Sequence, residues 1–490
     1  MTTEPSRGTA LALLAGLFAL GCAVRFASLG VQSFHHDEVI TAARVVPGTF
    51  GEMLHQVKRS ESNPPLYYVL AWGWVKAFGT GEVALRSLSA IFGAATVPLG
   101  YAIGRELSGR RAGLLAAALL AVNPMLIWYS QEARSYAVLV FFAAASLLFF
   151  ARALRTRDPL DLTLWALTSA LALCSHYFAV FAVGIEALWL LVALRARWRA
   201  VVPAVAAVGL AGLALVPLIS AQVNPAHIGW IDEIPLASRA FQTGVSFLIG
   251  ETGHVIAEPP RERYALLPTF LIAMAVLLVA TRGTRREKRG AAIGGALGLG
   301  VVALTVISAL VGKDYVVERN LLPALAPLAT AAAIGFATAG ARRLGPLLAA
   351  VLCAYWVAFD AYVTQTPNLQ RPDYGSIVET LGPPRVPRAI VTWKLAADPV
   401  RFYLRDRSLR VYSGTIPVRE LDVVGKSTVK RVTGVPPGFR RVARVRFERL
   451  TLFRFMSSRT RQIPFYVLRR VRTGFGSDAV VADDPIRSGS

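Results

Sequence analysis

The sequence predicts an all-α membrane protein that crosses the bilayer about eleven times and ends in a small α/β domain. Three observations predict this class: 54% of the 490 residues are apolar, only 17% are charged, and the mean hydropathy is +0.49. A soluble chain of this length needs about a quarter of its residues charged. All three cysteines lie in apolar runs, which excludes a disulfide framework and a thiolate zinc site.

Eleven apolar runs approach the length of about 20 residues that a helix needs to cross a bilayer. They are 9–29, 85–104, 112–130, 136–151, 162–177, 178–194, 201–220, 264–281, 291–311, 321–340 and 344–363. Segment 66–79 is too short to cross and is rich in Trp and Tyr, which predicts a helix in the membrane interface. We therefore expect residues 1–363 to form a transmembrane domain.

The connections between these runs separate by charge. If the N-terminus is cytoplasmic, every inner connection is basic, as the positive-inside rule requires; these connections are 105–111, 152–157, 195–199, 281–289 and 341–343. The outer connections hold most of the acids and all six histidines, which are His35, His36, His55, His176, His227 and His254. We therefore expect a multi-pass protein with a cytoplasmic N-terminus and a first outer loop at 30–84.

The composition changes after the last run. Residues 364–490 contain 24 Lys and Arg against 10 Asp and Glu. The segments AIVTWKLAADPVRFYL and RSLRVYSG are typical of a strand, a helix and another strand, so we expect a small α/β domain at 364–480. With eleven crossings and a cytoplasmic N-terminus, we expect this domain on the outer side of the membrane. Residues 481–490 are expected to be a disordered tail.

The first outer loop carries an acidic pair, Asp37 and Glu38, in the motif SFHHDEVITAARV. Adjacent carboxylates at a membrane surface can act as a general base, bind a divalent cation, or do both. The alternative is a solvated pair in which Asp37 caps a helix. His36 lies beside the pair and favours a site.

Two further segments bring charge to the outer ends of apolar runs. Glu132 and Arg134 lie beside Tyr136 in the short turn of NPMLIWYSQEARSYAVL, and Arg319 follows Glu318 in KDYVVERNLLPALAPL. Guanidinium groups stay charged and match phosphate oxygens, so the two arginines can together neutralise a phosphate. The alternative is an Arg–Glu pair within each motif.

Four other residues are weaker candidates. His176 lies at another outer turn, SHYF, and Asn63 precedes two prolines in ESNPPLYYVL. Arg86 starts a run at the outer surface, where an arginine often snorkels to the interface. Glu186 lies near mid-depth in its run, where a protonated glutamate hydrogen-bonded between helices is the favoured interpretation and a functional role is the alternative.

Taken in order, six motifs resemble those of membrane glycosyltransferases with the GT-C fold. The motifs are SFHHDEVITA, NPPLYYVL, LRSLSAIFG, NPMLIWYSQEARSYA, SHYF and ERNLLPALAPL. They are most similar to bacterial members of glycosyltransferase family 39, which comprises protein O-mannosyltransferases and aminoarabinose transferases of lipid A. The resemblance extends over about residues 10–380 and includes RPDYGSIVETL after the last run.

The resemblance implies a hexosyl- or pentosyltransferase of the bacterial plasma (inner) membrane. Such an enzyme moves a sugar from a polyprenyl-phosphate donor to an acceptor hydroxyl on the outer face, usually with inversion. Its partners would be that donor, an extracytoplasmic glycan, lipid or protein acceptor, and the lipid bilayer, without nucleic acid. No cofactor is implied with certainty, and a divalent cation at Asp37 and Glu38 stays an open alternative.

The same resemblance suggests roles for individual residues. Asp37 would be the base that deprotonates the acceptor and Glu38 a supporting acid, while Arg134 and Arg319 would hold the phosphate. The weaker phosphate candidates are Arg86 and His176, and the remaining site candidates are Glu132, Tyr136, Asn63 and His36. Asn63 departs from the pattern, because relatives often have Lys or His before the two prolines.

The chemistry fits these residues independently of the family. A sugar phosphodiester is already activated, so catalysis needs a base near the attacking oxygen and cations near the departing phosphate. A ligase or polymerase of lipid-linked glycans would also use arginines at the outer face, although the acidic pair favours the monosaccharide transferase. A secondary transporter would place ionisable groups at mid-depth, where this chain offers only Glu186.

Overall fold

The computed structural model describes residues 4–223, 231, 234–252, 261–404, 414–473 and 478–483. It divides into two compact units. Unit 1 comprises Met1–Leu29 and Arg44–Tyr362, and unit 2 comprises Gly30–Ala43 and Val363–Ser490. His227, His254 and the last seven residues of the predicted tail lie outside the described residues.

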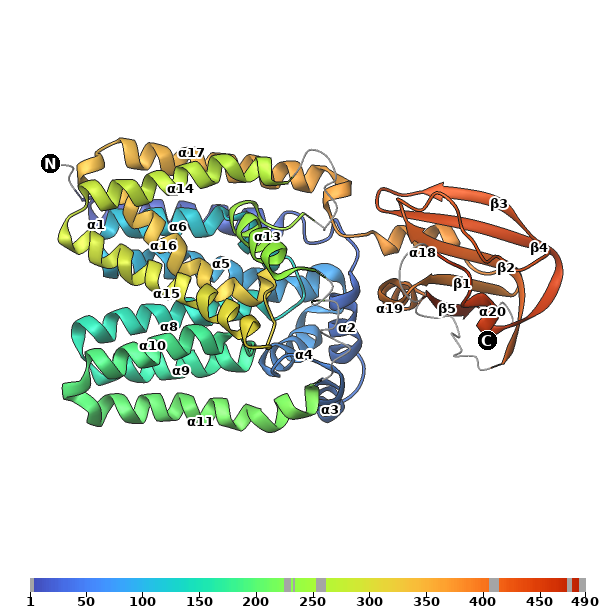
Figure 1. Cartoon of the computed structure of the whole chain (residues 1–490), viewed down its shortest axis with the longest axis horizontal. Helices are drawn as coiled ribbons and strands as arrows, with labels where there is room; N and C mark the ends of the chain where they lie inside the picture. Colours follow the sequence, from blue (N-terminus) through green and yellow to red (C-terminus); the bar gives the residue numbers. More distant parts are fainter. Residues whose placement is uncertain are drawn as a thin grey trace. The chain divides into compact units, whose positions relative to one another are not determined.

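Unit 1 is a bundle of helices that run side by side (Figure 1). The helices are α1 (Arg7–Phe26), α3 (Phe50–Ser60), α4 (Leu66–Phe78), α5 (Glu82–Leu107), α6 (Arg110–Val122), α7 (Pro124–Ser130), α8 (Tyr136–Thr156), α9 (Pro159–Ser175), α10 (Ala179–Ala193), η1 (Arg195–Arg197), α11 (Trp198–Gln222), α13 (Leu236–Ile249), α14 (Glu262–Arg282), α15 (Arg285–Leu310), η3 (Glu318–Ala324), α16 (Leu325–Ala337), η4 (Ala339–Ala341) and α17 (Leu344–Gln365).

All eleven predicted membrane-crossing runs fall on helices of this bundle. Among the described residues, eight helices are long and apolar enough to cross a membrane, or nine if α6 and α7, bent by 56°, form one span. The other two, α9 and α10, have 17 and 15 residues. The predicted interfacial helix is α4. The prediction of a mostly helical, multi-pass membrane protein is therefore confirmed.

Burial separates interior helices from lipid-facing ones. In α8, 72% of the most apolar window is buried, and in the span formed by η3 and α16 the share is 83%. In α11, which lies at one edge of the bundle in Figure 1, it is only 6% although the helix is among the most apolar. An exposed surface of this kind is stable only when a bilayer covers it.

The bend between α6 and α7 is stabilised by Arg25, a fully buried residue of α1. Pro124 has no N–H, so the carbonyl of Leu120 loses its helical partner. Arg25 replaces that partner, because its Nη2 donates to the Leu120 oxygen at 2.9 Å and its Nη1 to the Ala121 oxygen at 2.7 Å. Gly93 of α5 permits the close approach of α7, since a Cβ there would lie 2.0 Å from the Ser130 hydroxyl.

Unit 2 is a five-stranded sheet with the strand order β3-β4-β2-β1-β5. Its strands are β1 (Arg388–Trp393), β2 (Thr415–Lys426), β3 (Phe439–Arg446), β4 (Leu450–Pro464) and β5 (Asp478–Asp483). β1 and β2 pair in parallel, and the other pairs are antiparallel. β5 includes the first three residues of the predicted tail. The prediction of a small C-terminal α/β domain is confirmed, and the strand predicted from RSLRVYSG lies, as far as Ser413, outside the described residues.

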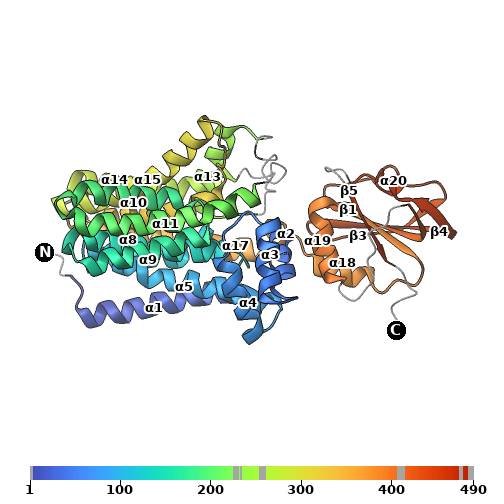
Figure 2. The same cartoon turned by 90° about the horizontal axis from the view of Figure 1, so that it is seen from below.

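Helices cover both faces of this sheet. α18 (Tyr374–Leu381) and α19 (Lys394–Tyr403) pack through Ile377 and Val400 on one face, as Figure 2 shows. The short α20 (Phe465–Leu468) packs on the other face. Unit 2 also takes in most of α2 (His36–Val45), since the division between the units falls after Ala43.

Candidate active site

Arg134 is held in a buried cluster of unit 1. It lies in the turn between α7 and α8, and its Nη1 lies 3.2 Å from the carboxylate of Glu61 and donates to the hydroxyl of Tyr68 at 3.0 Å. The same Glu61 oxygen lies 2.8 Å from Nη1 of Arg44, in the last turn of α2. We call these four residues the Glu61 cluster. All four are less than 9% exposed, so the interaction belongs to the interior of the protein.

Electrostatics keep the Glu61 cluster ionised. Burial by itself raises the pKa of Glu61, but the positive charges of Arg134 and Arg44 outweigh it, and the net pKa lies below the usual value. Burial raises the pKa of Tyr68 well above its usual value, so the Tyr68 hydroxyl stays protonated and donates to Glu61. The cluster therefore places a carboxylate and two guanidinium groups together in a low-dielectric site.

Sequence reasoning did not identify Arg44, Glu61 or Tyr68 as site residues. Glu61 and Tyr68 lie in the motif ESNPPLYYVL, whose predicted site residue is Asn63. The available signal was the number of charged and hydroxyl groups within this short segment before an apolar helix. Arg134, the ion-pair partner of Glu61, is 73 residues away in the sequence. A separation of this length leaves no local pattern from which the pair could be predicted.

His176 lies in the turn between α9 and α10 and is buried. Burial first, and then the positive charges of Arg134 and Arg319, lower its pKa to about 3. Its Nδ1 accepts a hydrogen bond from the N–H of Phe178 at 3.3 Å, which places the proton of the neutral ring on Nε2. The structure thus brings the predicted residues Arg134, Arg319 and His176 into one electrostatic neighbourhood.

The loop before Arg319 is fixed by a long-range ion pair. Both terminal nitrogens of Arg239, in α13, donate to the carboxylate of Asp314, and the distance from Nη1 is 2.8 Å. Nη1 also donates to the carbonyl of Val316 at 2.9 Å. The ring of Tyr315 lies 5.2 Å from that of Phe178, between centroids. These contacts connect the loop to the turn that carries His176, and neither Arg239 nor Asp314 was among the predicted site residues.

The remaining unit 1 candidates make contacts that involve backbone carbonyls or an aromatic ring. The Asn63 carbonyl accepts from Gln222 at 3.1 Å. Arg86 is 1% exposed, so it does not snorkel to an interface, and it donates to the carbonyl of Leu29 at 2.8 Å. The ring of Tyr136 lies 5.8 Å from that of His176. The carbonyl of Glu132 accepts from the N–H of Arg134 at 2.7 Å, and the Glu132 side chain is buried.

The acidic pair of the first loop lies in unit 2, at the start of α2. Helix α2 begins at His36, and Asp37 and Glu38 occupy its first turn. The Glu38 carboxylate accepts from the backbone N–H of His35 at 3.2 Å and lies 2.9 Å from its Nδ1. Glu38 therefore makes the capping contact of this helix. The alternative interpretation, in which Asp37 is the N-cap of a helix, is wrong, because Asp37 is already inside the helix.

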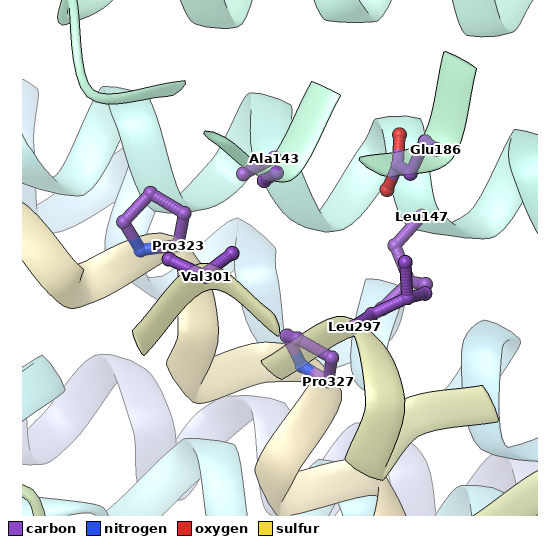
Figure 3. Close-up of a pocket in the computed structure, with 8 residues that line it drawn as sticks. Ala143, Leu147, Glu186, Leu297, Val301, Pro323 and Pro327 are labelled. Atoms are coloured by element: carbon purple, nitrogen blue, oxygen red, sulfur yellow. The ribbon is translucent and has the colours of Figure 1, made fainter. Parts of the chain in front are cut away.

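Glu186 has a structural environment in the bundle. Its carboxylate accepts from the indole Nε1 of Trp165 at 2.9 Å, and it is buried. It borders a cavity of about 10 Å³, which is about the space that one water needs. Figure 3 shows the lining residues, which are Ala143, Leu147, Ala182, Glu186, Leu297, Val301, Pro323 and Pro327. The cavity is too small for a sugar or a lipid chain.

Comparisons with known proteins agree with this architecture. The model of the family described as dolichyl-phosphate-mannose-protein mannosyltransferase matches residues 62–220, a segment that includes Asn63, Tyr68, Arg134 and His176. No curated protein matches the sequence. The crystal structure of ArnT from Cupriavidus metallidurans in the apo state is similar with a TM-score of 0.60 and 13% identity, over 91% of this chain and 98% of that chain.

A second structure of ArnT from the same organism, bound to undecaprenyl phosphate, is similar with a TM-score of 0.55 and 13% identity. This match covers 92% of the present chain and 98% of the ArnT chain. Both comparisons thus extend through the helix bundle and the C-terminal domain. The chain therefore has the fold of the GT-C glycosyltransferases, as its ordered motifs predict.

Proposed function

We propose that the protein is a glycosyltransferase that moves a sugar from a polyprenyl-phosphate carrier to an acceptor hydroxyl, with inversion. The observation that carries this proposal is that the positive charges of Arg134 and Arg319, which come from separate segments, both act on the buried His176. A guanidinium has five N–H donors, so Arg134 can hold Glu61 and a phosphate oxygen at the same time. A neutral His176 can donate one further hydrogen bond from Nε2.

The reaction follows from these groups. Asp37, as the base, takes the proton of the acceptor hydroxyl while its oxygen attacks the anomeric carbon of the sugar. The bond between that carbon and the phosphate oxygen breaks, and its electron pair leaves with the polyprenyl phosphate. Arg134 and Arg319 stabilise the charge that this leaving group gains. Attack on the face opposite the phosphate inverts the anomeric centre.

The comparisons support the donor class. ArnT, which shares the fold over nearly the whole chain, has been solved with undecaprenyl phosphate, and the matching family model is named for a dolichyl-phosphate mannose enzyme. Both carriers are polyprenyl phosphates. We extend this donor class to the present chain, with an extracytoplasmic glycan, lipid or protein as the acceptor and a lipid bilayer as the surroundings.

The alternatives are less well supported. A secondary transporter would need an ionisable group that faces a substrate pathway, but Glu186 accepts a hydrogen bond from Trp165 and borders only a water-sized cavity. A ligase or polymerase of lipid-linked glycans would use arginines in the same way. The acidic residue Asp37 in the first loop favours the monosaccharide transferase.

We further propose that the enzyme lies in the plasma (inner) membrane, with the N-terminus in the cytoplasm and the C-terminal domain outside. The basic connections at 105–111, 152–157 and 281–289 support this orientation through the positive-inside rule. The active site would then face the outer side, where carrier-linked sugars are used.

The function is tested with purified protein in lipid and a panel of polyprenyl-phosphate sugars. We expect one member of the panel to release polyprenyl phosphate, at a rate that rises when candidate acceptors are added. A parallel reaction with a chelator tests whether a divalent cation at Asp37 and Glu38 takes part. Turnover of polyprenyl-pyrophosphate glycans, with none of monophosphate sugars, would reject the proposal in favour of the ligase.

A further inference from the structure

The segment that leads into the acidic pair is bound by the C-terminal part of unit 2. The Ser33 hydroxyl accepts from the N–H of Tyr374 at 2.7 Å and donates to the carbonyl of Pro372 at 3.3 Å. The N–H of Phe34 donates to the hydroxyl of Tyr403 at 2.6 Å. These contacts join residues that are about 340 to 370 positions apart in the sequence.

Side-chain packing strengthens the same attachment. The ring of Phe34 is fully buried and meets the ring of Phe402 edge to face, with 5.7 Å between centroids. Nδ1 of His36 lies 3.5 Å from the carboxylate of Asp398 in α19. The Gln32 side chain hydrogen-bonds to that of Gln370. Every residue from 32 to 34, and His36 after them, is therefore in contact with the C-terminal part of the chain.

This attachment determines where α2 begins. Residues 33–35 have no regular secondary structure, so local hydrogen bonds do not set their conformation. Their conformation is set by the contacts with α19 and with residues 370–374. Helix α2 starts at the next residue, His36, and Glu38 caps it through His35. Asp37 is therefore three residues beyond Phe34, on the first turn of a helix whose entry is fixed by the C-terminal domain.

We propose that Tyr403 and Phe402 are positioning residues for Asp37, which lies in the same unit. The proposal rests on the function above, in which Asp37 is the base. A base must lie within hydrogen-bond reach of the proton it removes, and a displacement of about 1 Å can cost roughly 10²-fold in rate. A fixed entry to α2 meets this requirement.

The test compares three variants in the same lipid. Tyr403→Phe removes the hydroxyl that accepts from the N–H of Phe34. Ser33→Ala changes the N-terminal side of the attachment instead, because it removes the hydroxyl that contacts Tyr374 and Pro372. Tyr466→Phe is the matched control, because Tyr466 is a 61% exposed tyrosine of the same domain. We expect kcat to fall by about tenfold or more in the first two variants, with the KM for the donor unchanged, and no change in the control.

A double-mutant cycle separates positioning from general support. If Tyr403 acts through Asp37, then Tyr403→Phe should lower the residual turnover of the Asp37→Asn protein by less than twofold. Hydrogen exchange provides a measure that does not depend on turnover: amides 34–39 should exchange faster in both variants, while those of α8 and α16 keep their protection.

Two results would overturn the proposal. One is full turnover in both Tyr403→Phe and Ser33→Ala. The other is an equal loss in the wild-type and Asp37→Asn backgrounds, which a merely structural role would produce. Normal turnover of Asp37→Asn alone is a different outcome, since it would reject Asp37 as the base and with it the proposed mechanism.

Discussion

The carboxylate of Glu61 lies 3.2 Å from Nη1 of Arg134, although 73 residues separate them in the chain. The same oxygen lies 2.8 Å from Arg44. One buried acid thus serves two guanidinium groups from different segments. The ion pair of Arg134 thus runs to an acid outside the QEARS motif, whereas the alternative interpretation of that motif was an Arg–Glu pair within it.

Glu61→Gln should destabilise the protein strongly. The variant leaves the buried charges of Arg44 and Arg134 without this carboxylate, and removing one partner of a buried ion pair typically costs about 3–5 kcal/mol. Thermal unfolding in detergent, followed with a dye or by circular dichroism, measures the effect. Glu379→Gln is the control, because Glu379 is exposed on α18. Since a loss of this size lowers the midpoint by several degrees, a midpoint within about 1 °C of wild type would contradict the importance of the cluster.

Asp37→Asn should lower turnover by about 10²–10⁴-fold, the usual contribution of a general base. The fold should persist, because the capping contact of α2 is made by Glu38. Glu38→Gln keeps the capacity to cap, since Gln is accepted at this position, and should change stability little. Near-normal turnover of Asp37→Asn, measured as released polyprenyl phosphate, would remove Asp37 from the mechanism.

Arg134→Lys and Arg319→Lys should raise the KM for the donor by about tenfold or more. Lysine keeps the charge but lacks the planar fork that matches phosphate oxygens. A snorkelling anchor would tolerate lysine, but Arg134 is buried, so this alternative is already disfavoured for it. Arg440→Lys on the exposed edge strand β3 is the control. Unchanged donor use in both variants would leave the phosphate site unassigned.

His176 should make the protein less stable in acid. Its pKa is about 3 in the fold, owing to burial and to Arg134 and Arg319, against 6.5 as the reference value. Because the folded pKa is lowered, the unfolded chain takes up the proton first as the pH falls below 6.5, and stability is lost from there down to about pH 3. The cost at pH 5 is about 2 kcal/mol.

The measurement for His176 is the thermal midpoint between pH 7.5 and pH 5 in one detergent. His176→Gln should show a smaller fall than wild type over this range, and His55→Gln on the exposed surface of α3 controls for the loss of a histidine. An equal fall in wild type and His176→Gln would show that His176 is not the group responsible.

The orientation is tested with single cysteines in a background without Cys22, Cys174 and Cys353. Ser458→Cys on β4 should react with an impermeant reagent added outside, and Lys288→Cys in the first turn of α15 should not. Both positions are exposed. The reverse labelling pattern would place the C-terminal domain in the cytoplasm.

The sequence by itself determined the elements that depend on local composition. Each apolar run that it predicts falls on one helix or on consecutive helices, since a chain inside a bilayer must satisfy its own backbone hydrogen bonds. The change to a charged composition after residue 363 likewise predicts the C-terminal domain. Motif order was enough to indicate the fold, because it reflects the order of the helices along the chain.

Only the tertiary structure decided which charged groups meet. Arg86 looked like a snorkelling anchor, yet it is buried and holds the Leu29 carbonyl. A helix cap was the alternative role for Asp37, yet Glu38 makes that contact. Glu61 pairs with Arg134, which is 73 residues away in the sequence, and Phe34 contacts Tyr403, which is 369 residues away. Such pairings depend on how helices and domains pack. Because side chains far apart in the chain leave no periodic pattern in the sequence, neither hydropathy nor motif spacing predicts these pairs.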